Sequence, residues 1–329
     1  MPRRRRPLVL LRDCLHLESW RTPLFSAPDY VSCELFIIQR CDICGLVQTY
    51  PRLSGEQVVR YYPHGYYGRE KRYSKLLENM LAGLYAFRAW RLETLNGSGP
   101  GQVFDIGCGR GLLLYQLRRR GWAVSGSELT DLSAQYAREI LQLSVAVGDV
   151  VDLGLPDESF SAIILWHVLE HLVDPDAVLR DAARLLYPGG TILVAVPNFS
   201  SIESRWSKSR WFHLDVPRHL HHFTPQTLQG MLQGVGLEVY HADYFAPEYD
   251  FFSFVQTSLN MLGIRQNTLY NLLRTSDAKL LQGHQSPHLA DIIASLLLAP
   301  ILGLISLIWV PLMVLSRRGA TVTLYARKL

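Results

Sequence analysis

The chain has 329 residues, of which 48% are hydrophobic and 19% are charged, and its formal net charge is +4 at pH 7. The positive excess comes largely from the arginines at 3–6, which argues against a broad basic surface and therefore against a nucleic-acid partner. Five unevenly spaced cysteines do not suggest a disulfide framework, and the apolar run after the arginines is shorter than we expect of a secretion signal. We therefore expect a cytoplasmic protein with a sizeable core.

The sequence divides into five stretches by composition and pattern. Residues 1–60 hold four of the five cysteines and are predicted to form a small N-terminal module, which a tyrosine-rich linker over 61–74 follows. A core of alternating strands and helices is predicted over 75–248. Residues 249–317 are predicted to form a helical, partly membrane-like insertion, and residues 318–329 to return to the core as its last strand.

The region 75–248 alternates β-rich runs with amphipathic segments, the pattern of a parallel α/β sheet. The predicted strands are QVFDIG, AVSGSE, VAVGD, FSAIILW and TILVAVPN. The segments between them, LLLYQLRRR, SAQYAREILQL and DPDAVLRDAARLL, place apolar residues three to four apart and are predicted helices. The terminal ATVTLYARKL alternates and is β-branched, which predicts a strand.

A glycine-rich loop, VFDIGCGRG, follows the first predicted strand of this region and opens a helix. Gly107, Gly109 and Gly111 would let the backbone turn tightly and approach a ligand, and the helix would present free N–H groups to it. Two acids accompany the loop: Asp105 lies just before the glycines, and Glu128 ends the next predicted strand. A carboxylate in that second place commonly holds a ribose diol.

The glycines alternate as G-x-G-x-G, so the loop departs from the dinucleotide pattern and resembles motif I of the class I S-adenosylmethionine (SAM) methyltransferases. The elements VLEH at 168–171, DP at 174–175, PGG at 188–190 and VPN at 196–198 resemble the branch that includes many bacterial methyltransferases of small molecules and glycans. The resemblance covers roughly residues 75–248 and the last strand. It implies a Rossmann-like seven-stranded sheet with an antiparallel last strand.

The resemblance also implies which residues surround SAM. The glycine backbone would border the methionine part, with Asp105 near its amino group, and Glu128 would take the ribose hydroxyls. Asp149 and Val150 would lie at the adenine, and Trp166 would line the pocket near the reactive methyl group. The residues assigned to SAM are Asp105, Gly107, Cys108, Gly109, Gly111, Glu128, Asp149, Val150 and Trp166.

Histidines are the candidate bases, because a hydroxyl acceptor commonly needs a base near neutral pH. HVLEH contains His167, and PRHLHHFT, which resembles a recurrent element of the same branch, contains His219. We predict His219 first, then His167, as the catalytic or acceptor-positioning base. Alignment of the acceptor without a base is the alternative. Resemblance to ubiquinone-type O-methyltransferases further implies a divalent cation near His167, Glu170 and His171.

The N-terminal RCDICGLVQTYPR resembles the second half of a zinc-binding module found ahead of some methyltransferases of this branch. Cys41 and Cys44 form one C-x₂-C pair, whereas a structural zinc site normally needs four ligands. The first pair is absent, and Cys14, His16 and Cys33 are the substitutes available. We therefore predict a degenerate module, with zinc on Cys41 and Cys44 as the alternative.

An uncharged run from 292 to 316 is long enough to span a bilayer. If the last strand joins the sheet, however, a single crossing would separate that strand from its neighbours. We therefore expect two short helices broken near Pro300, which leave and return on one side. The run would touch a membrane through residues 289–318, or pack as a buried insertion or a dimer face.

We interpret the chain as a SAM-dependent methyltransferase that O-methylates a sugar, a glycan precursor or a lipid-linked small molecule, located in the cytoplasm or on the inner face of its membrane. Two alternatives remain. One is a non-catalytic scaffold that keeps the fold. The other is a nucleotide-dependent oxidoreductase, against which the alternating glycines and the VLEH, PGG and VPN elements count.

Overall fold

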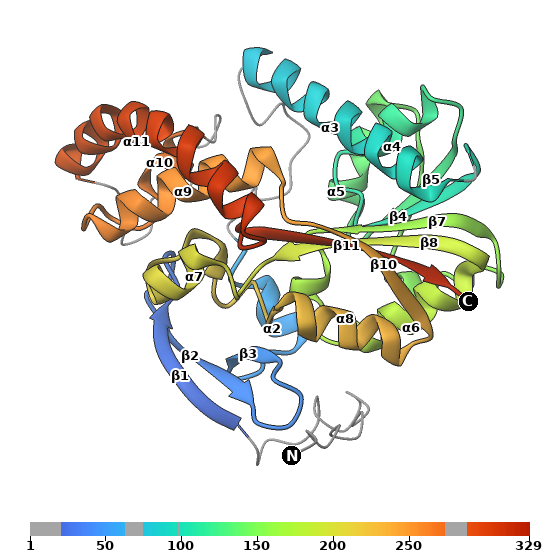
Figure 1. Ribbon diagram of the computed structural model, residues 1–329, viewed down its shortest axis with the longest axis horizontal. Coiled ribbons are helices and arrows are strands. Elements are labelled where there is room, and N and C mark those ends of the chain that lie inside the picture. Colours follow the sequence, from blue (N-terminus) through green and yellow to red (C-terminus); the bar gives the residue numbers. More distant parts are fainter. Residues whose placement is uncertain (1–20, 63–74, 98, 274–287) are drawn as a thin grey trace.

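A computed structural model gives the arrangement of the chain (Figure 1). It describes residues 21–62, 75–97, 99–273 and 288–329, without the side chains of 75–81. Two sheets organise these residues, one of seven strands and one of four. Helices cover both faces of the larger sheet, and a helical lobe lies beside it (Figure 1).

The larger sheet has the strand order β10-β11-β8-β7-β4-β5-β6. Its strands are β4 (Gln102–Ile106), β5 (Ala123–Glu128), β6 (Ser144–Val147), β7 (Phe160–Trp166), β8 (Leu186–Pro197), β10 (Leu237–Asp243) and β11 (Thr321–Lys328). Strands β4 to β8 run parallel, and β11 lies antiparallel between β8 and β10. This confirms the predicted α/β class and the antiparallel last strand.

Two hydrophobic cores lie on the two faces of this sheet. The helices of one face are α3 (Lys75–Asn96), α4 (Leu112–Arg118) and α5 (Asp131–Gln135), which pack on Val103, Ile164 and their neighbours. The other face is covered by α6 (Pro175–Leu185) and α8 (Pro225–Gly234), which pack on Ile163, Val194 and their neighbours. Because both faces are covered, the central strands are apolar on both sides, and this explains why they read as continuous hydrophobic runs.

The smaller sheet joins the N-terminal module to the core. Its order is β1 (Arg21–Pro28), β2 (Leu35–Cys41), β3 (Val47–Tyr50) and β9 (His221–His222), all antiparallel. The last member comes from the PRHLHHFT segment, with Val47 opposite His222 and Gln48 opposite His221. In the chain, β3 is followed by the short helix α2 (Gly55–Val59), which starts with a capping box between Ser54 and Gln57.

The helical lobe contains α7 (Ile202–Ser207), α9 (Pro247–Met261), α10 (Thr268–Leu273) and α11 (Leu289–Leu315). Here one prediction is wrong: the apolar run forms a single helix of 27 residues with Pro300 and Pro311 inside it, and not two helices broken near Pro300. Each proline removes one backbone hydrogen bond, but the helix continues because α9 and α10 pack along it.

Candidate active site

The glycine loop lies at the carboxyl end of β4, with its glycines in left-handed backbone conformations. The φ angles are +69° for Gly107, +55° for Gly109 and +70° for Gly111. A Cβ on Gly107 would lie 2.6 Å from Cγ2 of Val168, so the loop is closely packed against the segment after β7. A Cβ on Gly109 would meet nothing closer than the Glu128 carboxylate, 3.9 Å away. The Gly109 backbone is therefore the part of the loop that a ligand can approach.

The two predicted acids flank this loop. Glu128 Oε1 accepts a hydrogen bond of 2.6 Å from the Gly109 N–H, so the carboxylate lies directly beside the loop. Asp105 is buried, and its Oδ1 has no hydrogen-bond partner within the described part of the chain. Burial, together with the charge of Glu128, raises the pKa of Asp105 well above its usual range. A buried acceptor without a partner is the arrangement expected where a ligand donor binds.

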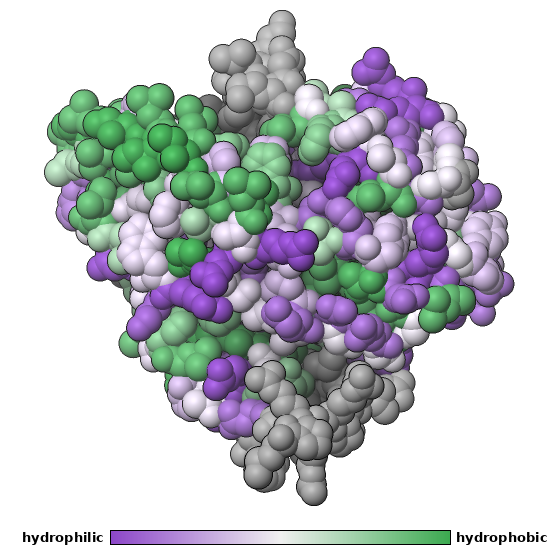
Figure 2. Space-filling view, viewed as in Figure 1, coloured by the Kyte–Doolittle hydropathy of each residue, from purple (hydrophilic) through white to green (hydrophobic). Residues whose placement is uncertain are grey.

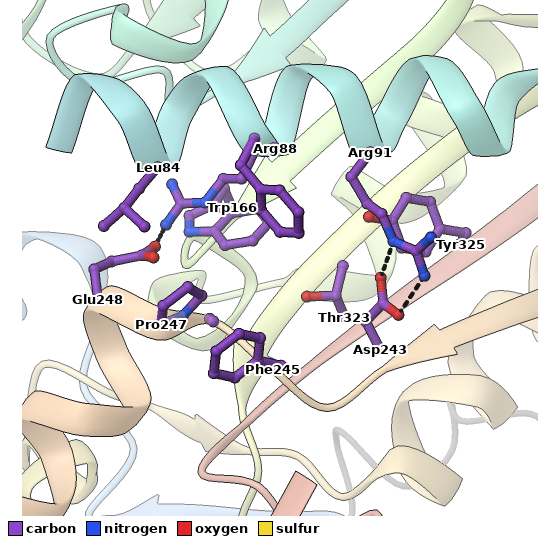
Figure 3. A pocket seen from close by; sticks show the side chains of 12 residues that line it. Leu84, Arg88, Arg91, Trp166, Asp243, Phe245, Pro247, Glu248, Thr323 and Tyr325 are labelled. Carbon is purple, nitrogen blue, oxygen red and sulfur yellow. Dashed lines mark hydrogen bonds and ion pairs between the residues drawn. The ribbon is translucent and has the colours of Figure 1, made fainter. Parts of the chain in front are cut away.

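A buried arginine completes this group and was missed by sequence reasoning. Arg88 lies on α3, with its guanidinium carbon 3.8 Å from the ring centroid of Trp166 (Figure 3). The same carbon lies 4.9 Å from the ring centroid of Tyr85. It forms an ion pair with Glu248 at the start of α9. Burial lowers the pKa of Arg88, and the nearby Tyr85, Tyr249 and Asp105 oppose that shift. No motif marks this arginine, because only the fold brings α3 over the end of β7.

Arg88 and Trp166 line a cleft between α3, the segment before α9, and β11 (Figure 3). Arg91 forms an ion pair with Asp243 in the same cleft, at 2.8 Å. The lining is partly aromatic and partly charged, and consists of Leu84, Phe87, Arg88, Arg91, Trp166, Asp243, Phe245, Ala246, Pro247, Glu248, Thr323 and Tyr325. The open space between these side chains is only about 20 Å³, so the cleft would have to widen to take an organic ligand.

The other predicted SAM residues lie around the same sheet edge. Asp149 follows β6, and its Oδ1 accepts from the Val151 N–H at 3.2 Å. Val150 is 1% exposed and packs in the core, so its side chain already has protein neighbours where contact with adenine was predicted. Burial raises the pKa of the Cys108 thiol, in keeping with a packing role for this cysteine.

His167 lies directly after β7 and beside Trp166. Its Nδ1 is 3.0 Å from Oε1 of the buried Glu170, and its ring stacks on Tyr249 with centroids 4.1 Å apart. Its Nε2 is buried without a hydrogen-bond partner in the described part of the chain. The residue has a φ of +54°, an uncommon conformation outside glycine that the bond to Glu170 helps to hold.

His219 also lies near Glu170. Its Nδ1 is 2.9 Å from the backbone carbonyl oxygen of His213, and its ring meets that of His171 edge-on at 4.6 Å. Burial lowers the pKa of His219 to about 4, so the ring is neutral at pH 7. Ligand atoms of Glu170, His171 and His219 lie within 4.8 Å of one another. One carboxylate and two imidazoles form a donor set that a divalent transition metal accepts.

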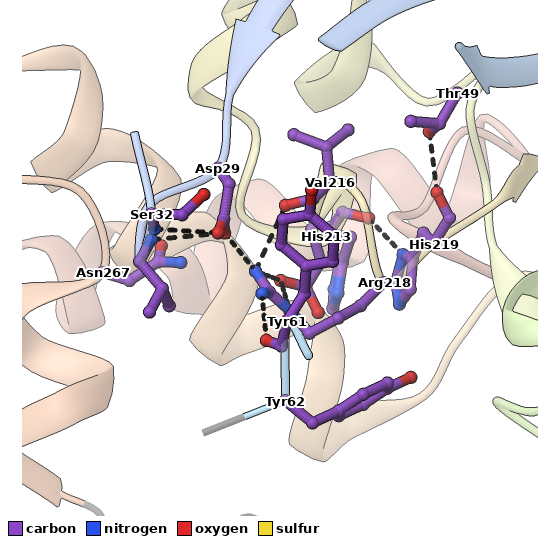
Figure 4. Close-up of polar contacts among 12 residues, drawn as sticks. Asp29, Ser32, Thr49, Tyr61, Tyr62, His213, Val216, Arg218, His219 and Asn267 are labelled. Atoms are coloured by element: carbon purple, nitrogen blue, oxygen red, sulfur yellow. Dashed lines mark hydrogen bonds and ion pairs between the residues drawn. The ribbon is translucent and has the colours of Figure 1, made fainter. Parts of the chain in front are cut away.

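An ion network holds the segment that carries His219 (Figure 4). The fully buried Arg218 pairs with Asp29 at 2.9 Å and with Asp215 at 2.7 Å, and it donates to the backbone oxygen of Tyr61 at 2.9 Å. Thr49 Oγ1 donates to the backbone oxygen of His219 at 2.7 Å. The N-terminal module therefore positions the histidine segment, a role that its cysteines did not predict.

The cysteine pair lies at the turn between β2 and β3. Cys41 is buried and Cys44 is half-buried. Cys33 precedes β2 at its opposite end, and a strand of seven residues, at about 3.3 Å per residue, separates it from Cys41 by roughly 20 Å or more. Cys33 therefore cannot share a metal ion with the pair. The substitutes Cys14 and His16 fall outside the described residues.

Comparisons with known proteins agree with this geometry. The methyltransferase domain family matches residues 76–242. The ubiquinone biosynthesis O-methyltransferase of Alkalilimnicola ehrlichii is 34% identical over 112 residues, which are 32% of this chain and 45% of that protein. The corresponding protein of Xanthomonas axonopodis pv. citri is 29% identical over 171 residues, 47% of this chain and 72% of that protein. The chain thus spans about half the length of the first of these relatives.

A solved structure shows the same fold. A Galdieria sulphuraria protein assigned as a sarcosine dimethylglycine methyltransferase superposes with a TM-score of 0.50 at 13% identity, covering 82% of this chain and 98% of that one. At this identity the likeness concerns the fold alone. The family match extends over half of the chain and contains the glycine loop, both acids and His167. The chain belongs to the methyltransferase domain family, within the class I SAM-dependent fold.

Proposed function

We propose that the protein transfers the methyl group of SAM to an oxygen atom of a small organic acceptor. The observation that carries this proposal is the buried Asp105 at the end of β4, beside the glycine loop. Its Oδ1 is an acceptor without a partner among the described residues, and the buried Arg88, which pairs with Glu248, opposes part of the rise in its pKa. The ammonium group of the methionine part of SAM would supply the missing donor.

When bound, SAM supplies a methyl group that is already activated by the sulfonium leaving group. The protein then has three tasks. Glu128 accepts hydrogen bonds from the ribose hydroxyls beside Gly109, the cleft under Arg88 and Trp166 excludes water, and the histidines around Glu170 hold the acceptor. His219 and His167 are the residues that we propose to take the proton from the acceptor oxygen.

Oxygen is the proposed acceptor atom because the curated relatives are O-methyltransferases. The aromatic lining of the cleft, including Phe245 and Trp166, suits an acceptor with an apolar part. We propose a sugar, a glycan precursor or a lipid-linked small molecule, met in the cytoplasm or at the inner face of its membrane. Zinc on Cys41 and Cys44 would need two further ligands from outside the described residues.

The first test is calorimetric titration of the protein with SAM and with S-adenosylhomocysteine. We expect dissociation constants in the micromolar range, and a weakening of about tenfold or more in Glu128→Ala, because charge-assisted hydrogen bonds to the ribose are lost. Glu128→Gln keeps an acceptor for the Gly109 N–H and separates the loss of charge from a disturbed loop.

The control is Glu238→Ala, which removes an exposed carboxylate on β10. It should bind like the parent protein. If well-folded parent protein binds neither compound, the proposed function is wrong and the protein is a non-catalytic scaffold that keeps the glycine loop. If Glu128→Ala binds as well as the parent, SAM is held in another way than we propose.

A further inference from the structure

Helix α11 exposes an apolar surface of unusual extent. No residue from 292 to 316 is charged, and only 11% of its most apolar stretch is buried. Leu297, Leu304 and Ile308 are each about two-thirds exposed and lie seven and four residues apart, which places them on one side of the helix. Figure 2 shows this surface as a continuous apolar area over the position of α11 in Figure 1.

The opposite side of α11 is attached to the protein. Ala294, Leu298 and Leu302 pack on the buried Val255 and Leu259 of α9, and farther along the helix Trp309 contacts Phe254 with ring centroids 5.7 Å apart. The helix thus lies along α9 over several turns. Its exposed side follows from this contact, because only one side of a helix can face its neighbour.

Both ends of α11 are fixed to the same body of protein. At its start, Asp291 Oδ1 accepts from the backbone N–H of Arg265 at 3.3 Å. After its end, Asn198 donates to the Gly319 backbone oxygen at 2.9 Å, and Asp250 accepts from the Thr321 N–H at 3.0 Å. A helix that crossed a bilayer would have its ends on opposite sides. The contacts of α11 therefore exclude a crossing while this fold is intact.

We propose that α11 is an in-plane membrane-docking helix, whose exposed side enters the interface of an anionic bilayer. Charge complementarity favours a lipid surface. Arg317 and Arg318 are exposed just after the helix, and no acidic residue lies between 292 and 318 to repel anionic headgroups. The helix length of about 40 Å, at 1.5 Å per residue, gives a long uncharged face of the kind that interfacial helices bury.

Docking would also place the cleft near the lipid. Pro247 and Glu248 begin α9 and line the cleft, and α9 is the helix on which α11 packs. If the proposed function holds, docking implies that the acceptor is lipid-linked and reaches the cleft from the bilayer surface. The docking itself is independent of the reaction and can be tested without it.

The experiment is flotation of the full chain with vesicles of phosphatidylcholine alone and of phosphatidylcholine with phosphatidylglycerol. The variant Leu297→Glu, Leu304→Glu, Ile308→Glu places three carboxylates on the exposed side. Its matched control, Leu35→Glu, Val59→Glu, Ile140→Glu, adds the same charges at equally exposed positions elsewhere. A second variant, Arg317→Glu with Arg318→Glu, tests the contribution of the anionic headgroups.

We expect the parent and the control to float with anionic vesicles, and the α11 variant to lose about tenfold or more in vesicle partition. The arginine variant should lose binding to the anionic vesicles in particular. A parent that stays unbound, or a control that loses as much as the α11 variant, overturns the proposal. So does a parent dimer in light scattering that the α11 variant converts to monomer without any flotation. SAM titration of the α11 variant should match the parent, which separates this test from that of the proposed function.

Discussion

The buried carboxyl of Glu203 makes the stability of the folded protein depend on pH. It lies on α7, 4% exposed, and accepts a hydrogen bond of 2.6 Å from Ser253 Oγ. Burial raises its pKa to about 7, and hydrogen bonds from Ser253, Trp211 and Thr257 offset only part of that rise. Because the folded pKa lies above the ordinary value, its stabilising contribution is present below pH 4.5 and is lost as the pH rises through 7.

Replacing this carboxyl should therefore change stability in a pH-dependent way. Glu203→Gln keeps the shape of the side chain and removes the ionisation. We therefore expect the free energy of unfolding of the variant, relative to that of the parent, to increase by roughly 1–3 kcal/mol from pH 5 to pH 8. Urea unfolding at both pH values measures this. The exposed Glu238→Gln should differ from the parent equally at both. An equal difference for Glu203→Gln as well would show that this carboxyl does not titrate as described.

The two histidines beside Glu170 make the acceptor chemistry testable. Burial lowers the pKa of His219 to about 4, so the ring is neutral at pH 7 and can accept a proton, although it is a weaker base than an ordinary histidine. We expect His219→Ala, and to a lesser degree His167→Ala, to lower turnover by about 10²–10⁴-fold with little change in SAM affinity. The exposed His288→Ala is the control. Full turnover in both variants would leave alignment alone as the mechanism, with the methyltransferase assignment intact.

At the scale of elements, a buried ion network joins the small sheet to the histidine segment. Asp29, just after β1, and Arg218, just before β9, are both fully buried and pair with each other. Asp29 also accepts from the backbone N–H groups of Val31 and Ser32. The small sheet is thus held to the core by charge as well as by the pairing of β3 with β9.

Removing one partner from this pair leaves a buried charge poorly compensated. We expect Asp29→Ala to lower the free energy of unfolding by about 3 kcal/mol or more. Asp42→Ala, which removes an exposed carboxylate bonded to Thr22, should cost much less. Urea unfolding of both variants gives the comparison. A loss in Asp29→Ala no larger than in Asp42→Ala would mean that Asp215 alone satisfies Arg218.

The elements differ in how far the sequence could predict them. The parallel strands β4 to β8 were predicted because they alternate with amphipathic helices and are flanked by turn residues, and the central strands β4, β7 and β8 are largely buried. The small sheet was not, because β9 has only two residues and pairs with a strand some 170 positions away. Arg88 was missed for the same reason: it is an ordinary helical arginine until the fold places it over Trp166.

At the scale of the whole molecule, the prolines in α11 misled the prediction of two helices. Local rules place a break at Pro300, but packing along α9 compensates for the lost backbone bonds. The last strand β11 does return to the sheet, as the predicted topology requires. The pairing of β11 with β8 determines that the apolar run does not cross a membrane. The helix-breaking tendency of its prolines does not determine whether the helix continues.

The position of β11 has a consequence for biosynthesis. This strand separates β8 from β10 in the sheet, yet a ribosome makes it after every other strand. Until β11 pairs, β8 has an unpaired edge. The apolar α11 lies directly before β11 in the sequence, so the two segments leave the ribosome together, and α11 is exposed until β11 has inserted. Capture of α11 by a chaperone or a nearby bilayer at that stage would protect the unfinished fold.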